Sequence, residues 1–236
     1  MLKKIIFILI FINMDTSYKN NSLNNIDSPI DYQDEDSATQ DNLNIDWDFI
    51  KLREGNENFG HQPTANSGIT IGMGFDLKEK TEGSLKDMGF DSDLIDELKP
   101  YLGLTGDEAA LKIKEKNLVL DDDKISKINR LSKKHYTDDI VSQYESTGKK
   151  FNKLSPEQQT IVMSVGYQYG NLKTRTPNFW KGVINDDWTS VVNELHNFGD
   201  EHDSRREIEA KYLFNSLDEL RGKKNRAPLD YPDKNL

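Results

Sequence analysis

The stretch that decides the fold is Glu54-Gly55, followed after ten residues by Asn66-Ser67-Gly68-Ile69-Thr70-Ile71-Gly72-Met73-Gly74-Phe75-Asp76-Leu77. Glu54 ends a short amphipathic segment, and Gly55 is a typical residue for the end of a helix. The β-branched run between the glycines predicts a small β-hairpin that ends in a second acid, Asp76. A carboxylate at a helix end and another at a hairpin end suit general acid and base work on a bond between them.

The size and composition of the chain narrow the classes of protein it can belong to. Its 236 residues are enough for one core or a modest pair of lobes. It has no cysteine, which excludes disulfides, thiolate metal sites and a cysteine nucleophile. None of its histidines has a neighbour at the spacing of a paired metal ligand, so we expect neither a metal site nor a cofactor.

The charge of the chain is unevenly distributed. The net charge is −10, yet nine acids against Lys19 fall between residues 14 and 48, and residues 49–236 carry only −4. A domain with this charge lacks the basic field that nucleic-acid binding needs, so nucleic acid is not an expected partner. We expect a monomer.

The N-terminal region predicts export. Lys3-Lys4 followed by eight apolar residues, Ile5–Ile12, is typical of a secretory signal over residues 1–13, and the alternative is an apolar element of the fold. As a helix the apolar run spans about 12 Å, too little for stable membrane insertion. Residues 14–45 are polar and predict a disordered acidic tether. The folded domain is expected over 46–225, with a loosely ordered tail over 226–236.

Most of the domain predicts helices. Asp46 is a plausible N-cap for Trp47–Glu54, and Ser155-Pro156-Glu157-Gln158 carries the cap, the proline and the glutamine of a strong helix start. Asp203 is expected to cap a helix over Glu207–Leu217, and Arg205-Arg206 with Glu207 and Glu209 is interpreted as a solvated helix start. The other expected starts are Ser84, Asp91 or Ser92, Thr105 (as a capping box for Glu108–Lys116), Asp121, Thr176, and Asp186 or Asp187. The fold class is therefore α+β and mostly α, with one small β lobe.

The wording of these motifs resembles a known family. Glu54-Gly55, then Gly68-Ile69-Thr70-Ile71-Gly72-x-Gly74, then Val165-Gly166-Tyr167-Gln168-Tyr169-Gly170 is similar to the phage-type lysozyme superfamily, and the fuller stretch 66–77 is closest to the muramidase domain of pesticin. The resemblance covers about residues 46–220. It implies a lysozyme-like fold, with a small β-hairpin lobe, a larger helical lobe and a cleft between them.

The resemblance also implies roles for three residues. Glu54 matches the general acid, Thr70 the threonine beside the attacking water, and Asp76 the second carboxylate of pesticin-like sites. Ordinary phage lysozymes place an aspartate between the glutamate and the hairpin motif, whereas residues 55–69 hold no aspartate and only one acid, Glu57. Asp76 is therefore the preferred second acid, and Glu57 is the reserve.

Each of these residues also has a plain structural interpretation. Glu54 could be a solvated residue of a last helical turn, although the helix dipole disfavours a bare carboxylate there. Asp76 could cap a turn, and Thr70 could be an ordinary strand residue. Tyr167, Gln168 and Tyr169 could line a sugar groove as substrate-binding residues, or they could belong to the core and the surface of their helix.

The sequence therefore predicts an exported, cofactor-free peptidoglycan hydrolase. The resemblance implies that it cleaves the β-1,4 bond between N-acetylmuramic acid and N-acetylglucosamine, and we expect inversion and action outside the cytoplasm as a secreted or periplasmic protein. Two alternatives remain: a lytic transglycosylase, and a non-catalytic cell-wall-binding module on the same fold. The expected partners are glycan strands and, for a toxin, a small immunity protein.

Overall fold

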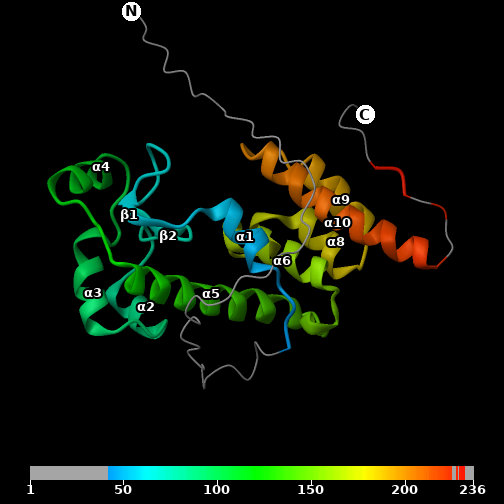
Figure 1. Ribbon diagram of the computed structural model, residues 1–236, viewed down its shortest axis with the longest axis horizontal. Helices are drawn as coiled ribbons and strands as arrows, with labels where there is room; N and C mark the ends of the chain where they lie inside the picture. The colour runs from blue at the N-terminus through cyan, green and yellow to red at the C-terminus, as the bar shows by residue number, and fades with distance from the viewer. Residues whose placement is uncertain (1–41, 225–226, 228, 232–236) are drawn as a thin grey trace, which may run out of the picture. The chain divides into compact units, whose positions relative to one another are not determined.

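A long helix, α5 (Asp122–Glu145), joins two lobes of the chain. The computed structural model describes residues 42–224, 227 and 229–231. The expected signal peptide and most of the expected tether lie outside these residues. Figure 1 shows α5 running beneath both lobes, with α2, α3, α4 and the sheet at one end and α1, α6, α8, α9 and α10 at the other.

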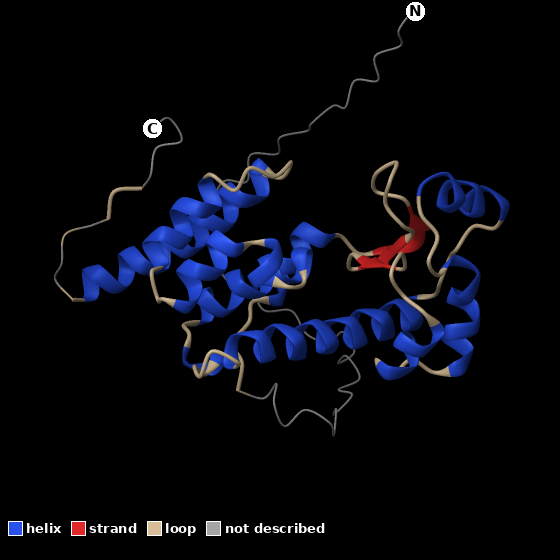
Figure 2. Ribbon diagram, turned by 180° about the vertical axis from the view of Figure 1, so that it is seen from behind, coloured by secondary structure: helices blue, strands red, loops and turns tan. Residues whose placement is uncertain are grey.

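The smaller lobe combines a short sheet with three helices and a 3₁₀ turn. The sheet is antiparallel with strand order β1-β2-β3, and Figure 2 shows it in red beside the small-lobe helices. The elements of this lobe are β1 (Glu57–His61), β2 (Thr70–Gly72), β3 (Phe75–Asp76), α2 (Glu82–Asp87), α3 (Ser92–Leu98), η1 (Lys99–Tyr101) and α4 (Gly106–Glu115).

The larger lobe is helical. Its most apolar helix, α6, begins after a Ser155 capping box, as the sequence predicts, and is buried along most of its length. The elements of this lobe are α1 (Trp47–Glu54), η2 (Phe151–Lys153), α6 (Pro156–Tyr169), α7 (Leu172–Arg175), α8 (Pro177–Ile184), α9 (Trp188–His196) and α10 (Asp203–Lys223).

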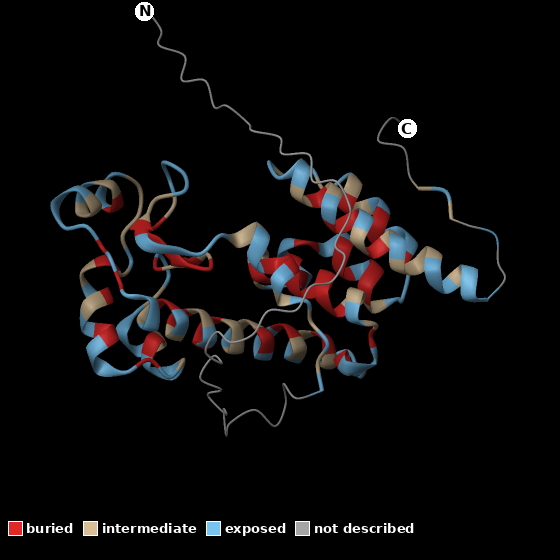
Figure 3. Cartoon of the chain, in the orientation of Figure 1, coloured by how far each residue is buried: buried red, intermediate tan, exposed pale blue. Residues whose placement is uncertain are grey.

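Each lobe has its own apolar core, and α5 contributes to both. Ile128 belongs to the small-lobe cluster, whereas Ile140 and Tyr144 belong to the large-lobe cluster. Figure 3 shows buried residues at intervals along α5. Since all described residues fall within one unit of contacts, residues 39–236, the two cores are parts of a single structure. The predicted α+β, mostly helical fold is confirmed.

Several expected boundaries were wrong. Thr81, not Ser84, caps α2, and Ser84 is its capping-box partner. The helix after Thr105 begins at Gly106 without a side-chain cap, and the helix expected to begin at Glu207 begins at Asp203. The sequence also gave no sign of α7, whose four residues are too few for a periodic pattern.

The folded part also begins a little earlier than residue 46. Leu43 and Ile45 pack against the large-lobe core, and the Asn44 N–H donates to the side-chain oxygen of Gln159 at 2.8 Å. These residues follow a strongly polar segment, which is why composition alone placed them in the tether. Within the part of the chain that the structure describes, no helix combines the length and apolarity needed to cross a membrane.

Candidate active site

Glu54 occupies the last turn of α1. The helix is fixed at its start by Asp46, whose carboxylate accepts a hydrogen bond from the Phe49 N–H at 2.8 Å. Phe49 and Ile50 bury the middle of the helix in the large-lobe core. Gly55, at φ +75°, ends it. The Glu54 side chain is 13% exposed, so it is sheltered from solvent but still reachable.

The second carboxylate lies on the small sheet. Thr70 of β2 pairs with Asp76 of β3 in the antiparallel register, so the two side chains are direct neighbours on one face of the sheet. Thr70 is buried. Asp76 also accepts a hydrogen bond from the Lys78 N–H at 2.8 Å, as the turn-capping interpretation predicts. One oxygen of Asp76 thus stabilises the turn while the residue faces the cleft.

Two motif glycines leave room for the two carboxylates. A Cβ at Gly74, where φ is +74°, would lie 3.0 Å from Oε2 of Glu54. A Cβ at Gly68 would lie 2.4 Å from Oδ1 of Asp76. Any side chain at either position would displace a carboxylate, so the glycines of the motif serve the site as well as the hairpin.

One cavity of about 800 Å³ brings the predicted residues together. Its lining includes Glu54, Thr70 and Asp76, together with Tyr167 and Gln168 from α6. Because these residues come from both lobes, the cavity is the cleft between them. Tyr169 is not among the lining residues, and its hydroxyl instead donates to Asp200 at 2.6 Å.

A buried charge network holds Glu54 from the side of α10. Arg205 donates to Oε1 of Glu54 at 2.6 Å and to Glu209 at 3.0 Å. Ser164 of α6 also donates to Glu209, at 2.6 Å. Arg205 therefore fixes the direction of the Glu54 carboxylate from the side of α10.

The start of α10 is not the solvated surface that the sequence suggested. Arg206 is 2% exposed and Glu209 is fully buried. Arg206 pairs with Glu209 and Asp200 and also donates to the side-chain carbonyl of Gln168. This face of α10 is buried because it packs on α6, where oppositely charged side chains one helical turn apart form ion pairs with each other.

Two tyrosines lie near the carboxylates, and one of them, Tyr167, lines the cavity. The rings of Tyr136 and Tyr167 meet edge to face at 4.7 Å, and the Tyr167 hydroxyl lies 3.4 Å from Ser132 Oγ. Burial, and then the nearby carboxylates of Asp76 and Glu54, raise the pKa of Tyr136 to about 12. The phenol is therefore neutral at ordinary pH. Tyr136 also lies close enough to both Asp76 and Glu54 for their charges to affect its pKa.

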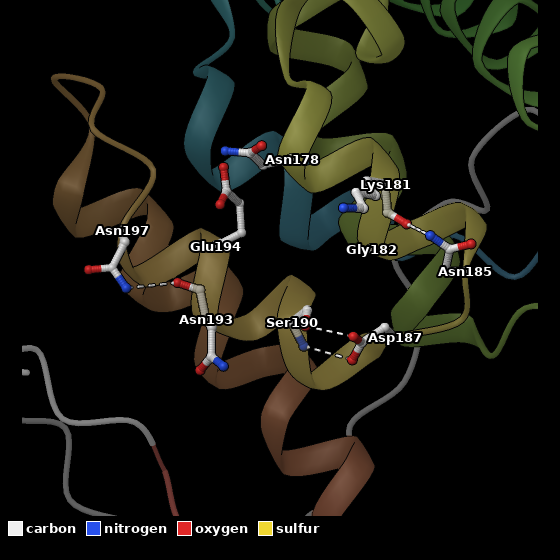
Figure 4. Close-up of a pocket in the computed structure, with 9 residues that line it drawn as sticks. All are labelled: Asn178, Lys181, Gly182, Asn185, Asp187, Ser190, Asn193, Glu194 and Asn197. Carbon is white, nitrogen blue, oxygen red and sulfur yellow. Dashed lines mark hydrogen bonds between the residues drawn. The ribbon is translucent and has the colours of Figure 1, made fainter.

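A second cavity lies elsewhere, between α8 and α9, and holds neither predicted acid (Figure 4). It measures about 420 Å³, and its lining includes four asparagines together with two acids, Asp187 and Glu194. Asp187 accepts hydrogen bonds from Ser190, which lower its pKa and mark it as a helix cap. The lobe-spanning cavity is therefore the better candidate active site.

Sequence reasoning missed Arg205, Tyr136 and His61, all of which lie at or beside the cleft. Only His61 carried a usable signal, because it ends the strand that precedes the hairpin. Among the described residues, no group of three or more His, Asp or Glu side chains is arranged to hold a metal ion.

The fold and the cleft define the class of protein: a lysozyme-like α+β protein with two carboxylates that line a lobe-spanning cavity. The chain belongs to the Pesticin family, described as a bacterial toxin homologue of phage lysozyme, C-terminal part, which it matches over residues 44–189. The resemblance inferred from the motifs is thereby confirmed. A search of curated proteins gave no match.

Proposed function

We propose that this protein is a muramidase, a peptidoglycan hydrolase that cleaves the β-1,4 bond between N-acetylmuramic acid and N-acetylglucosamine. Membership of a lysozyme-homologous toxin family supports a lytic enzyme of the glycoside hydrolase kind, acting on peptidoglycan outside the cytoplasm. The observation that carries the finer proposal is the single cavity lined by Glu54, Thr70 and Asp76.

In the proposed reaction Glu54 is the general acid. It donates its proton to the glycosidic oxygen as the bond to the anomeric carbon breaks. Arg205, at 2.6 Å, fixes the direction of the carboxyl group before substrate arrives. Gly74 leaves the space in which the carboxyl oxygen sits.

Asp76 is the proposed general base. It takes a proton from a water molecule that the neighbouring Thr70 hydroxyl helps to hold, and the water oxygen bonds to the anomeric carbon from the opposite face. Such a single displacement needs carboxyl groups about 6.5–9.5 Å apart, wide enough for the water, rather than the separation of about 5–5.5 Å typical of a double displacement. Placement on two separate elements suits the wider gap.

The anomeric form of the product tests this proposal. Proton NMR of fresh digests is expected to show reducing muramic acid ends of α configuration, with mass spectrometry showing one added water per cut. Products that are β at early times would contradict inversion. Anhydro-muramic acid ends would establish the transglycosylase alternative, and no cleavage at all would favour a binding module.

The biological setting is also part of the proposal. We propose that the N-terminal segment directs export, that the enzyme acts as a monomer and that, if it is a toxin, a small immunity protein protects the producer. Mass spectrometry of the native protein tests export, because the mature chain is then expected to begin within residues 14–25. An intact Met1 on a cytoplasmic protein would contradict it.

A further inference from the structure

An irregularity in β1 places a histidine beside Thr70 and Asp76, the two residues proposed to bind the attacking water. Glu57 pairs with Gly72 and His61 with Thr70, so β1 advances four residues where β2 advances two. The extra residues form a bulge, a feature that re-aims side chains beside active sites. As a result His61, and not Phe59, stands opposite Thr70.

The sheet therefore presents a row of three polar side chains. His61 of β1, Thr70 of β2 and Asp76 of β3 follow one another across the strands by direct register pairs. Residues paired in this way project from the same face, about 5 Å from one another. All three line the cavity that Glu54 enters from α1.

Within the part of the chain that the structure describes, the His61 imidazole has no hydrogen-bond partner. Within the described residues its Nδ1 is buried without a hydrogen-bond partner, and Nε2 makes no hydrogen bond either. Its one ring contact is with Phe59, at 5.9 Å. Nδ1 is the buried nitrogen, whereas Nε2 is not among the buried unpaired atoms, so Nε2 is the nitrogen that a water bound in the cavity can reach.

We infer that His61 is a third residue of the proposed hydrolase that binds the attacking water. Its imidazole accepts a hydrogen bond from this water, which Thr70 and Asp76 also contact. The inference rests on the proposed function. A neutral imidazole has one acceptor nitrogen and one donor nitrogen, which is what this task requires. In the step the water oxygen bonds to the anomeric carbon, the water proton goes to Asp76 and the Glu54 proton goes to the leaving oxygen. His61 ends the step with the proton it began with.

Replacement by residues of similar size separates hydrogen bonding from packing. His61→Phe keeps an aromatic ring but has no acceptor, so kcat on soluble glycan strands is expected to fall about 10- to 100-fold, with KM changed by no more than about threefold. His61→Gln restores an acceptor near Nε2, and it is expected to keep at least about tenfold more activity than the Phe variant. His61→Leu is a second apolar replacement in case the Phe variant does not fold.

A matched control uses another histidine. His135 is exposed on α5 and its ring contacts Tyr136, so His135→Phe makes the same chemical change away from the sheet and is expected to leave kcat unchanged. Circular dichroism and thermal unfolding check the fold of every variant.

The outcomes separate this inference from the proposed function. If the wild type cleaves glycan and Glu54→Gln does not, but folded His61→Phe or His61→Leu keeps wild-type kcat, then only the role of His61 is overturned. Equal losses of kcat in His61→Phe and His61→Gln would also overturn the inference, because they would show that the hydrogen-bond acceptor does not matter. A wild-type protein that cleaves nothing would overturn both proposals together.

Discussion

At the scale of single residues, the site depends on two glycines as much as on its carboxylates. Gly68 and Gly74 each border a carboxylate, Asp76 and Glu54 respectively, closely enough that a Cβ would collide with it. The sequence predicted both acids and the hairpin, because spacing and turn residues are local signals. It could not show why the glycines stand there, since the Glu54 side chain reaches the hairpin only in the folded protein.

Gly74→Ala tests this steric role. The substitution places a Cβ 3.0 Å from Oε2 of Glu54, and we expect activity to fall at least about tenfold because the acid is displaced. Gly148→Ala is the matched control: its φ is also positive, at +85°, but no atom lies within 4 Å of the new Cβ. Both variants are expected to lose about 1 kcal/mol of unfolding free energy, and only Gly74→Ala to lose activity. Full activity in a folded Gly74→Ala protein would refute the steric account.

The choice of second acid is tested by a pair of neutral substitutions. Asp76→Asn is expected to lower the rate of peptidoglycan clearance about 100-fold or more, whereas the exposed Glu57, at the start of β1, is expected to tolerate Glu57→Gln within about twofold. Turbidity assays on both variants decide between the two acids. If Glu57→Gln is the inactive variant, the role given to Asp76 is wrong.

At the scale of elements, the sequence predicted features that depend on neighbouring residues and missed features that depend on tertiary packing. Asp46 and Ser155 were predicted as helix caps because a cap lies within four residues of the N–H it satisfies. The burial of Arg206 and Glu209 was not predicted, because charges one turn apart look the same on a solvated face and on a buried one. Arg205 meets Glu54 across 151 residues, which no local pattern reports.

The buried network on α10 makes a prediction of its own. Glu209→Gln leaves Arg206 buried without its full counter-charge, and we expect it to lower the unfolding free energy by about 3 kcal/mol. Asp138→Asn removes one acid of an exposed pair with Lys134 on α5, and it is expected to cost less than about 0.5 kcal/mol. Urea unfolding of both variants makes the comparison. Equal, small losses would show that the network contributes little to stability.

At the scale of the whole molecule, α5 is the helix that packs in both apolar cores. Its first half packs in the small lobe through Ile128, and its second half in the large lobe through Ile140 and Tyr144. The cleft is lined from both lobes, so its shape depends on this shared helix. The sequence predicted a helix that starts after Asp121, but not that its two halves pack in different cores.

Coupling between the lobes can be measured with the native tryptophans. Trp47, Trp180 and Trp188 all lie in or against the large-lobe core. Ile128→Ala creates a cavity in the small lobe, and we expect the tryptophan unfolding transition to move as well, by about 2–4 kcal/mol. Val119→Ala, an exposed truncation in the same lobe, serves as the control. A tryptophan transition unmoved by Ile128→Ala would mean that the lobes unfold independently.

The most direct test of the account is the initial rate at which reducing muramic acid ends appear from purified peptidoglycan. We expect the wild type to release them, and Glu54→Gln, which keeps the shape of the acid but has no transferable proton, to be slower by about 100-fold or more. Glu194→Gln, in the cavity between α8 and α9, makes the same substitution away from the cleft and is expected to match the wild type. Near-wild-type release by a folded Glu54→Gln protein, or no release by the wild type, would contradict the account.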